Sequence, residues 1–247
     1  MCTLAAKKMS DGWFLAKTRD PVSWMRWDDE IRLFDSKSDR LRKYIIQNPD
    51  IHEDGYYGGM NEKGVAFVST YVHVDENQIS YIRRPYVRFI LDAGSAKEAV
   101  TIIKRFYPKI GGNMFIADSR ECFAIEGAPE RYFIEKIKGA SVKTNHYVHL
   151  PDKNLVFSAN PALKTWSEFR KSRAEELLKK TENVKDMENL LRDRKNSEKG
   201  ISICRTSKEL ACYTHSAFIF DTQNKTIYYS QGNPLENPFK KYVFPKK

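Results

Sequence analysis

Cysteine is scarce in this sequence, and long apolar runs are missing. Four of the 247 residues are cysteines, namely Cys2, Cys122, Cys204 and Cys212, and no two of them form a Cys-x-x-Cys pair. A disulfide framework or a zinc finger is therefore not expected, and we interpret the four side chains as reduced thiols. No apolar segment approaches the ~20 residues of a membrane span, and the N-terminal apolar stretch is too short for a secretory signal. We expect a cytoplasmic protein that does not enter a membrane.

An excess of acidic residues is also missing. The chain has 42 lysines and arginines against 32 aspartates and glutamates, which gives a net charge of +10. Such a charge favours anionic partners, from nucleic acid to acidic small molecules. The basic region 164–199 is interrupted by glutamates, as is typical of a solvated helical face. Nucleic-acid binding therefore stays an unfavoured alternative.

The hydrophobic pattern predicts a single α+β domain over residues 1–247. Strands are expected as a hairpin at 2–7 and 13–17, at 65–72, in a meander at 114–117, 122–126 and 132–137, and at 216–220 and 226–230. The sequence Ser95-Ala96-Lys97-Glu98 forms a capping box and predicts a helix to about Tyr107. Residues 161–194 predict two further helices. Because the helices are grouped between runs of strands, layered α+β structure is favoured over regular βαβ alternation.

The region between the first hairpin and the strand at 65–72 is less regular. Residues 22–54 are charged, aromatic and poorly periodic, and we expect a helical part around 40–47. The glycines of Gly55-Tyr56-Tyr57-Gly58-Gly59 predict a flexible segment or a tight turn.

Cys2 is the first candidate nucleophile. Removal of Met1 would place a thiol and a free α-amine on one residue, with ordinary pKa values of about 8.5 and roughly 7.7–8.0. The amine can then accept the thiol proton, so nucleophile and base are combined. The predicted hairpin returns Lys17, Arg19 and Asp20 beside Cys2, where a carboxylate orients the amine and a cation stabilises the thiolate. Position alone favours a small residue that has no catalytic role.

Three segments resemble the choloylglycine hydrolase and penicillin V acylase family of N-terminal-nucleophile (Ntn) hydrolases, which has related cysteine acyltransferases and dipeptidases. They are Ala16-Lys17-Thr18-Arg19-Asp20, Gly59-Met60-Asn61-Glu62-Lys63-Gly64-Val65-Ala66 and Val142-Lys143-Thr144-Asn145-His146. The first is similar to the family's Ala-Lys-Asn-x-Asp, with threonine in place of asparagine. The second is similar to its Gly-Met-Asn-Glu-Lys-Gly-Leu-Ala, and the third to its Thr-Asn motif. The resemblance implies a four-layer αββα sandwich.

The resemblance also implies roles for individual residues. Asp20 falls on the catalytic aspartate of the family, and Lys17 falls on a position that holds arginine or lysine. The side chain of Asn145 and the backbone N–H of Tyr71 would donate to the oxyanion. An amide NH₂ suits this task because it donates without titrating. We add Arg19 as a second candidate for stabilising the thiolate.

The predicted reaction is cleavage of a linear carbon–nitrogen amide in a small-molecule N-acyl substrate, through a thioester on Cys2. An apolar acyl group is expected, and no metal or organic cofactor is required. Acyl transfer or dipeptidase activity through the same acyl-enzyme stays open, as do a non-catalytic basic binding protein and a homo-oligomer. Tyr56, Tyr57 and Trp24 are candidates for lining an acyl pocket, although aromatic side chains most often fill a core.

Two further positions qualify this prediction. Bile-salt hydrolases carry an active-site arginine where this sequence has Ala217, so this cation is either missing here or supplied elsewhere, with Arg205 and Arg19 as candidate substitutes. A bile-salt substrate is not assumed. His146-x-x-His149 lacks a third ligand at a recognised spacing, so exposed loop histidines are favoured over a metal site.

Overall fold

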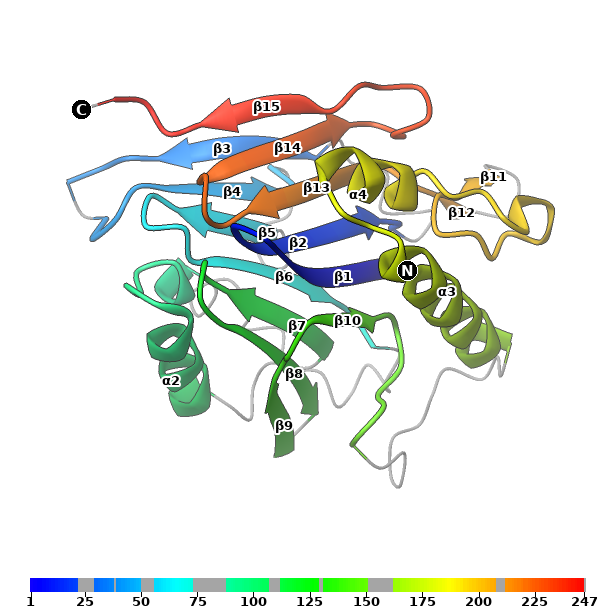
Figure 1. Ribbon diagram of the computed structural model, residues 1–247, viewed down its shortest axis with the longest axis horizontal. Helices are drawn as coiled ribbons and strands as arrows, with labels where there is room; N and C mark the ends of the chain where they lie inside the picture. Colours follow the sequence, from blue (N-terminus) through cyan, green and yellow to red (C-terminus); the bar gives the residue numbers. More distant parts are fainter. Residues whose placement is uncertain are drawn as a thin grey trace.

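The structure, a computed structural model, describes residues 1–21, 29–37, 39–49, 56–72, 88–106, 112–128, 131–150, 162–207 and 212–246. In this part of the chain, two antiparallel sheets pack face to face and helices cover their outer faces (Figure 1). The predicted α+β class and the four-layer αββα arrangement are confirmed.

The six-stranded sheet has the order β10-β1-β2-β13-β14-β15. Its strands are β1 (Cys2–Met9), β2 (Gly12–Arg19), β10 (Ala140–Lys143), β13 (Ser216–Asp221), β14 (Thr226–Gln231) and β15 (Lys240–Val243). The expected hairpin is confirmed, and its register places Cys2 opposite Arg19. The first residue of β1 therefore lies beside the last residues of β2, as the sequence predicted.

The seven-stranded sheet follows chain order from β3 to β9. Its strands are β3 (Glu30–Phe34), β4 (Lys43–Gln47), β5 (Tyr56–Asn61), β6 (Ala66–Thr70), β7 (Gly112–Ala117), β8 (Cys122–Ala128) and β9 (Arg131–Lys136). The predicted meander corresponds to β7, β8 and β9. A separate short pair is formed by β11 (Thr206–Ser207) and β12 (Cys212–Tyr213).

Three apolar clusters separate the four layers. One lies between the sheets, one between the seven-stranded sheet and α2 (Ala96–Phe106), and one between the six-stranded sheet and α3 (Ala162–Lys179) with α4 (Val184–Leu191). Leu15 and Phe218 belong to the cluster between the sheets. Ile103 and Ile116 belong to the cluster under α2, and Ala16 and Leu178 to the cluster under α3 and α4. The predicted cap of α2 is present, because the Glu98 N–H donates to Ser95 Oγ at 3.1 Å. A short 3₁₀ helix, η2 (Ser197–Lys199), follows α4.

Two expectations for the region before β6 are wrong. Residues 43–47 form β4 rather than a helix, and Gly58 lies inside β5 rather than in a turn. Ile45 and Ile46 face opposite sides of the sheet and are both buried, so the alternation that identifies a half-buried strand is missing. Gly58 allows close approach of the two sheets, because an added Cβ would lie 2.6 Å from the ring of Phe218.

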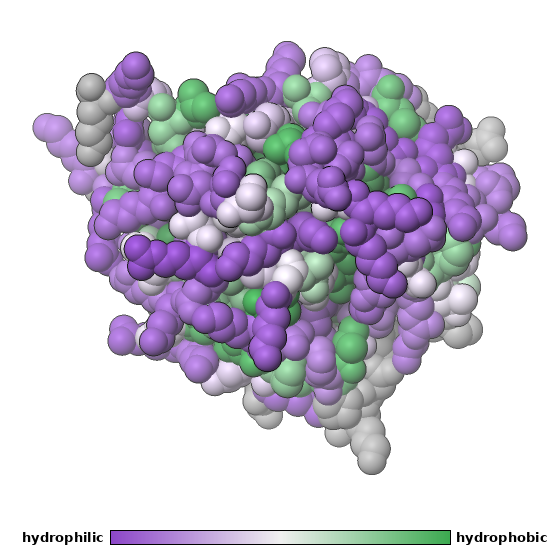
Figure 2. Space-filling model, viewed as in Figure 1, coloured by the Kyte–Doolittle hydropathy of each residue, from purple (hydrophilic) through white to green (hydrophobic). Residues whose placement is uncertain are grey.

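One face of the molecule is predominantly polar. Figure 2 shows a face on which hydrophilic residues predominate and hydrophobic residues form small, separate patches. Such scattered apolar groups are normal for a protein surface. In the described part of the chain, no helix is long and apolar enough to cross a membrane.

Candidate active site

Cys2 lies at the start of β1, buried beside α3, where Figure 1 marks the N-terminus. Its backbone N–H donates to Asn145 Oδ1 at 2.9 Å, and its carbonyl oxygen accepts from Arg170 Nη1 at 2.8 Å. The amine of Met1 donates to the backbone oxygen of Asp20. Residues from β1, the end of β2, the segment after β10 and α3 therefore meet around the first peptide bond.

The Lys17 ammonium is buried between the two sheets. It donates to the carbonyl oxygen of Ser69 at 2.6 Å and to that of Tyr57 at 3.2 Å, and it lies 5.1 Å from the centroid of the Tyr57 ring. Burial lowers the pKa of Lys17 to about 8, against the opposing attraction of the Cys2 sulfur. This lysine is therefore a buried cation that is electrostatically coupled to the thiol.

Arg19 is held between a carboxylate and an aromatic ring. Its Nη1 lies 2.9 Å from Asp29 Oδ1, its Nη2 donates to the Tyr57 hydroxyl at 2.8 Å, and its guanidinium carbon lies 4.1 Å from the centroid of the Tyr57 ring. Burial raises the pKa of Tyr57 to about 12, so its hydroxyl stays protonated. The charge of Arg19 is thus largely matched by Asp29, and Lys17 is the cation that acts more directly on Cys2.

Asp20 is buried at the end of β2. Thr214 donates to its Oδ1 at 2.7 Å, whereas its Oδ2 is buried without a hydrogen-bond partner among the described residues. Burial lowers the pKa of the N-terminal amine, and Asp20 opposes this by raising it. A carboxylate oxygen is therefore available close to the chain terminus.

Arg205 lies near the same terminus. Its backbone N–H donates to Thr214 Oγ1 at 2.8 Å, and its Nη2 donates to the carbonyl oxygen of Gly200 at 2.5 Å. After burial, which is the main cause, its positive charge lowers the pKa of the N-terminal amine further. Arg205 is thus a buried cation, and its role as a substitute for the arginine missing at Ala217 stays a prediction.

Asn145 and Tyr71 meet beside residue 2. Asn145 Nδ2 donates to the Tyr71 carbonyl oxygen at 2.6 Å and to Thr70 Oγ1 at 2.9 Å. The Asn145 backbone N–H donates to Ser167 Oγ at 2.7 Å. The amide NH₂ of Asn145 therefore points toward the end of β6, and its oxygen points toward Cys2.

The cysteines differ in acidity. Burial alone would raise the pKa of the Cys2 thiol, but the positive charges of Lys17 and the N-terminus outweigh it, so this pKa lies below its ordinary value. Burial raises the pKa of Cys204 to about 12 and raises that of Cys122 strongly. Among these three thiols, Cys2 is the one that its surroundings activate.

Comparison with known proteins places this geometry in a family. The sequence matches the acyl-coenzyme A:6-aminopenicillanic acid acyl-transferase family over residues 7–236. The chain belongs to this family. No curated protein matches the sequence significantly.

Solved structures show the same fold. A cysteine-to-alanine variant of conjugated bile acid hydrolase from Clostridium perfringens matches with a TM-score of 0.60 at 14% identity, over 100% of this chain and 98% of that chain. Penicillin V acylase from Agrobacterium tumefaciens matches with a TM-score of 0.58 at 14% identity, over 94% of this chain and 83% of that chain. The resemblance found in the sequence is confirmed, and family and fold together support an Ntn amidohydrolase or acyltransferase.

Not every predicted residue of this acyl-transferase-family protein reaches the site. Tyr57 lies between the sheets beside Lys17, but Tyr56 faces the opposite side of β5 and packs against the α2 cluster, because successive strand residues alternate in direction. Tyr56 therefore lies on the other side of the sheet from Tyr57 and Lys17. Trp24 lies outside the described residues. Ala217 packs in the cluster under α3 and α4.

One of the two histidines differs from expectation, whereas His149 is exposed as predicted. His146 is buried rather than exposed, with Nδ1 2.8 Å from Ser167 Oγ, and burial lowers its pKa. His149 stacks on Phe133 at a centroid distance of 4.1 Å, and its Nδ1 lies 3.1 Å from Glu126 Oε1. The described residues contain no group of three or more side chains that could hold a metal ion.

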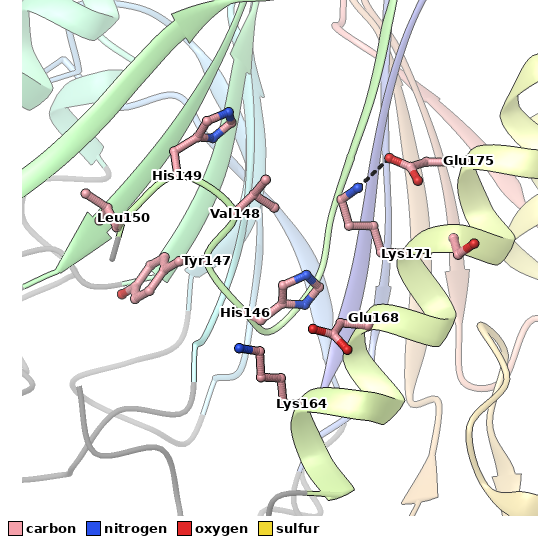
Figure 3. Close-up of a pocket in the computed structure, with 10 residues that line it drawn as sticks. His146, Tyr147, Val148, His149, Leu150, Lys164, Glu168, Lys171 and Glu175 are labelled. Carbon is pink, nitrogen blue, oxygen red and sulfur yellow. Dashed lines mark hydrogen bonds and ion pairs between the residues drawn. The ribbon is translucent and has the colours of Figure 1, made fainter. Parts of the chain in front are cut away.

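A pocket of about 540 Å³ lies between the segment that follows β10 and helix α3. The segment after β10 and the exposed face of α3 line it, and Figure 3 shows His146, Lys164, Glu168 and Lys171 converging there. Lys171 is paired with Glu175 at 2.5 Å. The lining of this pocket includes neither Cys2 nor Asp20, so we do not assign the acyl group to the pocket.

Arg170 is the site residue that the sequence analysis missed. It is fully buried, and its guanidinium contacts both Cys2 and Asn145. A signal was present, because Arg170, Ala174 and Leu178 share the inward face of α3 at helical spacing, and an arginine there is unusual.

We expect the replacement of Lys17 by methionine to make the Cys2 thiol less acidic. Burial would then dominate, so the pH midpoint for iodoacetamide labelling of Cys2 should rise by about one unit and the rate at pH 7 should fall about tenfold. Timed labelling from about pH 5 to 10, read by peptide mass spectrometry, measures this. Lys8→Met, on the exposed part of β1, is the control and should leave the midpoint unchanged. An unchanged midpoint in the Lys17 variant would contradict this role.

Proposed function

We infer that the protein is an N-terminal-cysteine amidohydrolase that acts on a small N-acyl amide. The observation that carries this inference is the convergence of a buried, acidified thiol, an unpartnered carboxylate oxygen and a side-chain amide on residue 2. Membership of an acyl-transferase family, whose fold is shared by a penicillin V acylase and a conjugated bile acid hydrolase, supports acyl chemistry on amides.

The proposed cycle begins with removal of Met1, which converts the Cys2 peptide nitrogen into an α-amine. This nitrogen already lies 2.9 Å from Asn145 Oδ1, and Asp20 Oδ2 provides a second acceptor for it. The amine accepts the thiol proton, and Lys17 stabilises the thiolate. Burial and the cations Arg205 and Arg170 keep the pKa of the Met1 amine below its ordinary value. The same surroundings would keep the Cys2 amine unprotonated near neutral pH, and only an unprotonated amine can accept the thiol proton.

The thiolate then attacks the amide carbonyl carbon, and the carbonyl oxygen becomes an oxyanion. Asn145 Nδ2, which exchanges its hydrogen bond to Thr70 Oγ1 for one to this oxygen, and the Tyr71 backbone N–H are the proposed donors. Collapse breaks the carbon–nitrogen bond, and the leaving amine takes the proton from the Cys2 ammonium. A thioester remains on Cys2. Water adds to it, passes one proton through the α-amine to the sulfur, and releases a carboxylic acid.

Acyl transfer is the second candidate, because the family is named for an acyltransferase. An amine acceptor would replace water in the last step, and an amide rather than an acid would be released. Adding 6-aminopenicillanic acid or a simple amino acid to the reaction and measuring the ratio of amide to acid separates the two activities.

The test is to trap the acyl-enzyme. We expect purified protein to lack Met1. On rapid acid quenching with penicillin V or N-acyl amino acids, its N-terminal peptide should gain the mass of the acyl group. Lability to hydroxylamine identifies a thioester rather than an amide. Retention of Met1 in a host that removes it before small residues, or acylation of Cys122 or Cys204 instead, would overturn the proposal.

A further inference from the structure

Helix α3 holds Asn145 at two points. Ser167 Oγ accepts the Asn145 backbone N–H at 2.7 Å, and Arg170 Nη2 donates to Asn145 Oδ1 at 2.9 Å. Ser167 and Arg170 are three residues apart and therefore share one face of the helix. On the other side, Asn113 Nδ2 donates to the carbonyl oxygens of residues 144 and 146, at 2.7 and 2.8 Å. The backbone of Asn145 is thus fixed independently of its side chain.

The orientation of the Asn145 amide is decided by charge and hydrogen-bond type. A guanidinium donates and never accepts. The atom of Asn145 that faces Arg170 must therefore be the oxygen, and this oxygen also accepts from the Cys2 nitrogen at 2.9 Å. A flipped amide would place its NH₂ against two donors. With Arg170 present, the NH₂ of Asn145 is committed to the side of Thr70 and Tyr71.

Arg170 also reaches the nucleophilic residue. Its Nη1 donates to the Cys2 carbonyl oxygen at 2.8 Å and lies 3.3 Å from Thr3 Oγ1. One buried side chain therefore spans β1 and the segment after β10, and fixes residue 2 relative to Asn145. A planar fork with donors on both ends performs this bridging, which a lysine cannot reproduce in full.

We propose that Arg170 is a positioning residue that orients the Asn145 amide toward the oxyanion. This inference rests on the proposed function and adds a residue to it. Arg170 acts through Asn145 and does not touch the reacting atoms, so its removal should impair steps that build an oxyanion and spare steps that do not.

Two reactions of Cys2 separate these cases. Alkylation by iodoacetamide is a displacement at carbon that develops no oxyanion. Acylation by p-nitrophenyl octanoate passes through a tetrahedral oxyanion and releases p-nitrophenolate. For Arg170→Met, measured on the pH plateau of the thiolate, we expect alkylation within about threefold of wild type and acylation reduced about 10- to 100-fold. The acylation rate of Arg170→Lys should lie between those of the wild type and Arg170→Met. Arg173→Met, on the same helix but paired with Asp193 and Glu176, is the matched control.

A double mutant tests whether Arg170 acts through Asn145. In an Asn145→Ala background, Arg170→Met should cause little further loss of acylation. Additive losses, equal losses of alkylation and acylation, or unchanged acylation in Arg170→Met would each overturn the inference and leave the proposed nucleophile intact. If Arg170→Met does not fold, the ratio of acylation to alkylation in Arg170→Lys decides the question. Absence of acylation at Cys2 in the wild-type protein would overturn both proposals.

Discussion

Cys2→Ala should lose at least about 10⁴-fold in the rate of cleavage of whichever amide the wild-type protein accepts. Alanine permits removal of Met1 and keeps the α-amine, so the variant lacks the sulfur alone. No thioester can form without it. The neighbouring contacts of residue 2 involve backbone atoms, namely its N–H to Asn145 and its carbonyl oxygen to Arg170, and they survive the change. Folding should therefore be preserved.

The measurement is the rate of product release, followed by liquid chromatography, with thermal melting as the check on folding. Cys122→Ala is the matched control, because this thiol is buried between the sheets and has a raised pKa. It should retain nearly all activity. Substantial activity in Cys2→Ala would move the chemistry to another residue and remove the basis of the proposed mechanism.

Glu126→Gln should lower the free energy of unfolding by about 3–5 kcal/mol. The Glu126 side chain is fully buried, and Lys143 donates to its Oε1 at 2.5 Å. Its oxygens also accept the backbone N–H groups of residues 148, 149 and 150, at 3.0, 2.8 and 3.0 Å. Glutamine leaves the buried Lys143 ammonium without its closest counter-charge and weakens the anchor of the segment that follows Asn145.

The pH dependence of this effect has a definite sign. Burial alone would raise the pKa of Glu126, but Lys143 and the backbone donors lower it from 4.5 to about 2. The stabilisation is therefore present above about pH 4.5 and is lost as the pH falls through about 2. Urea unfolding of both proteins at several pH values should show their difference shrinking over this interval.

A surface pair provides the control for Glu126. Glu121 pairs with Lys136, but the side chain of Lys136 is 58% exposed and that of Glu121 is 28% exposed. Solvent screens this pair, so Glu121→Gln should cost less than about 1 kcal/mol. Equal effects of the two substitutions would contradict the importance of burial at Glu126.

Local patterns were sufficient for much of the fold. The first hairpin, the cap at Ser95 and the meander of β7 to β9 each depend on neighbours in sequence, and each prediction led to the correct element. Strand β4 was not predicted, because a strand that is buried on both faces lacks the alternation of apolar and polar residues. Gly58 misled for a related reason. The ring of Phe218 leaves no space for a side chain at position 58, and this contact joins residues that are 160 positions apart, so no local pattern indicates it.

The residues of the candidate site also differ in whether the sequence alone could predict their positions. The hairpin register brought Lys17, Arg19 and Asp20 to Cys2 as expected, since it depends on one turn. The motif resemblance supplied Asn145, which the structure places against residue 2. Arg170 lies outside every motif used, and its meaning depends on how α3 crosses the end of β1. The face on which Tyr56 lies likewise followed only from the pairing of β5.

The outer strands of the two sheets bear on how copies of this protein meet. In the described part of the chain, β10 and β15 are the outer strands of one sheet, and β3 and β9 are those of the other. Three of them carry charged side chains, namely Lys240 and Lys241 on β15, Glu30 and Arg32 on β3, and Arg131 and Lys136 on β9. Charges along an edge disfavour the addition of a foreign strand. These borders therefore resist the edge-to-edge pairing that leads to aggregation, and their lysines and arginines contribute to the net basic charge.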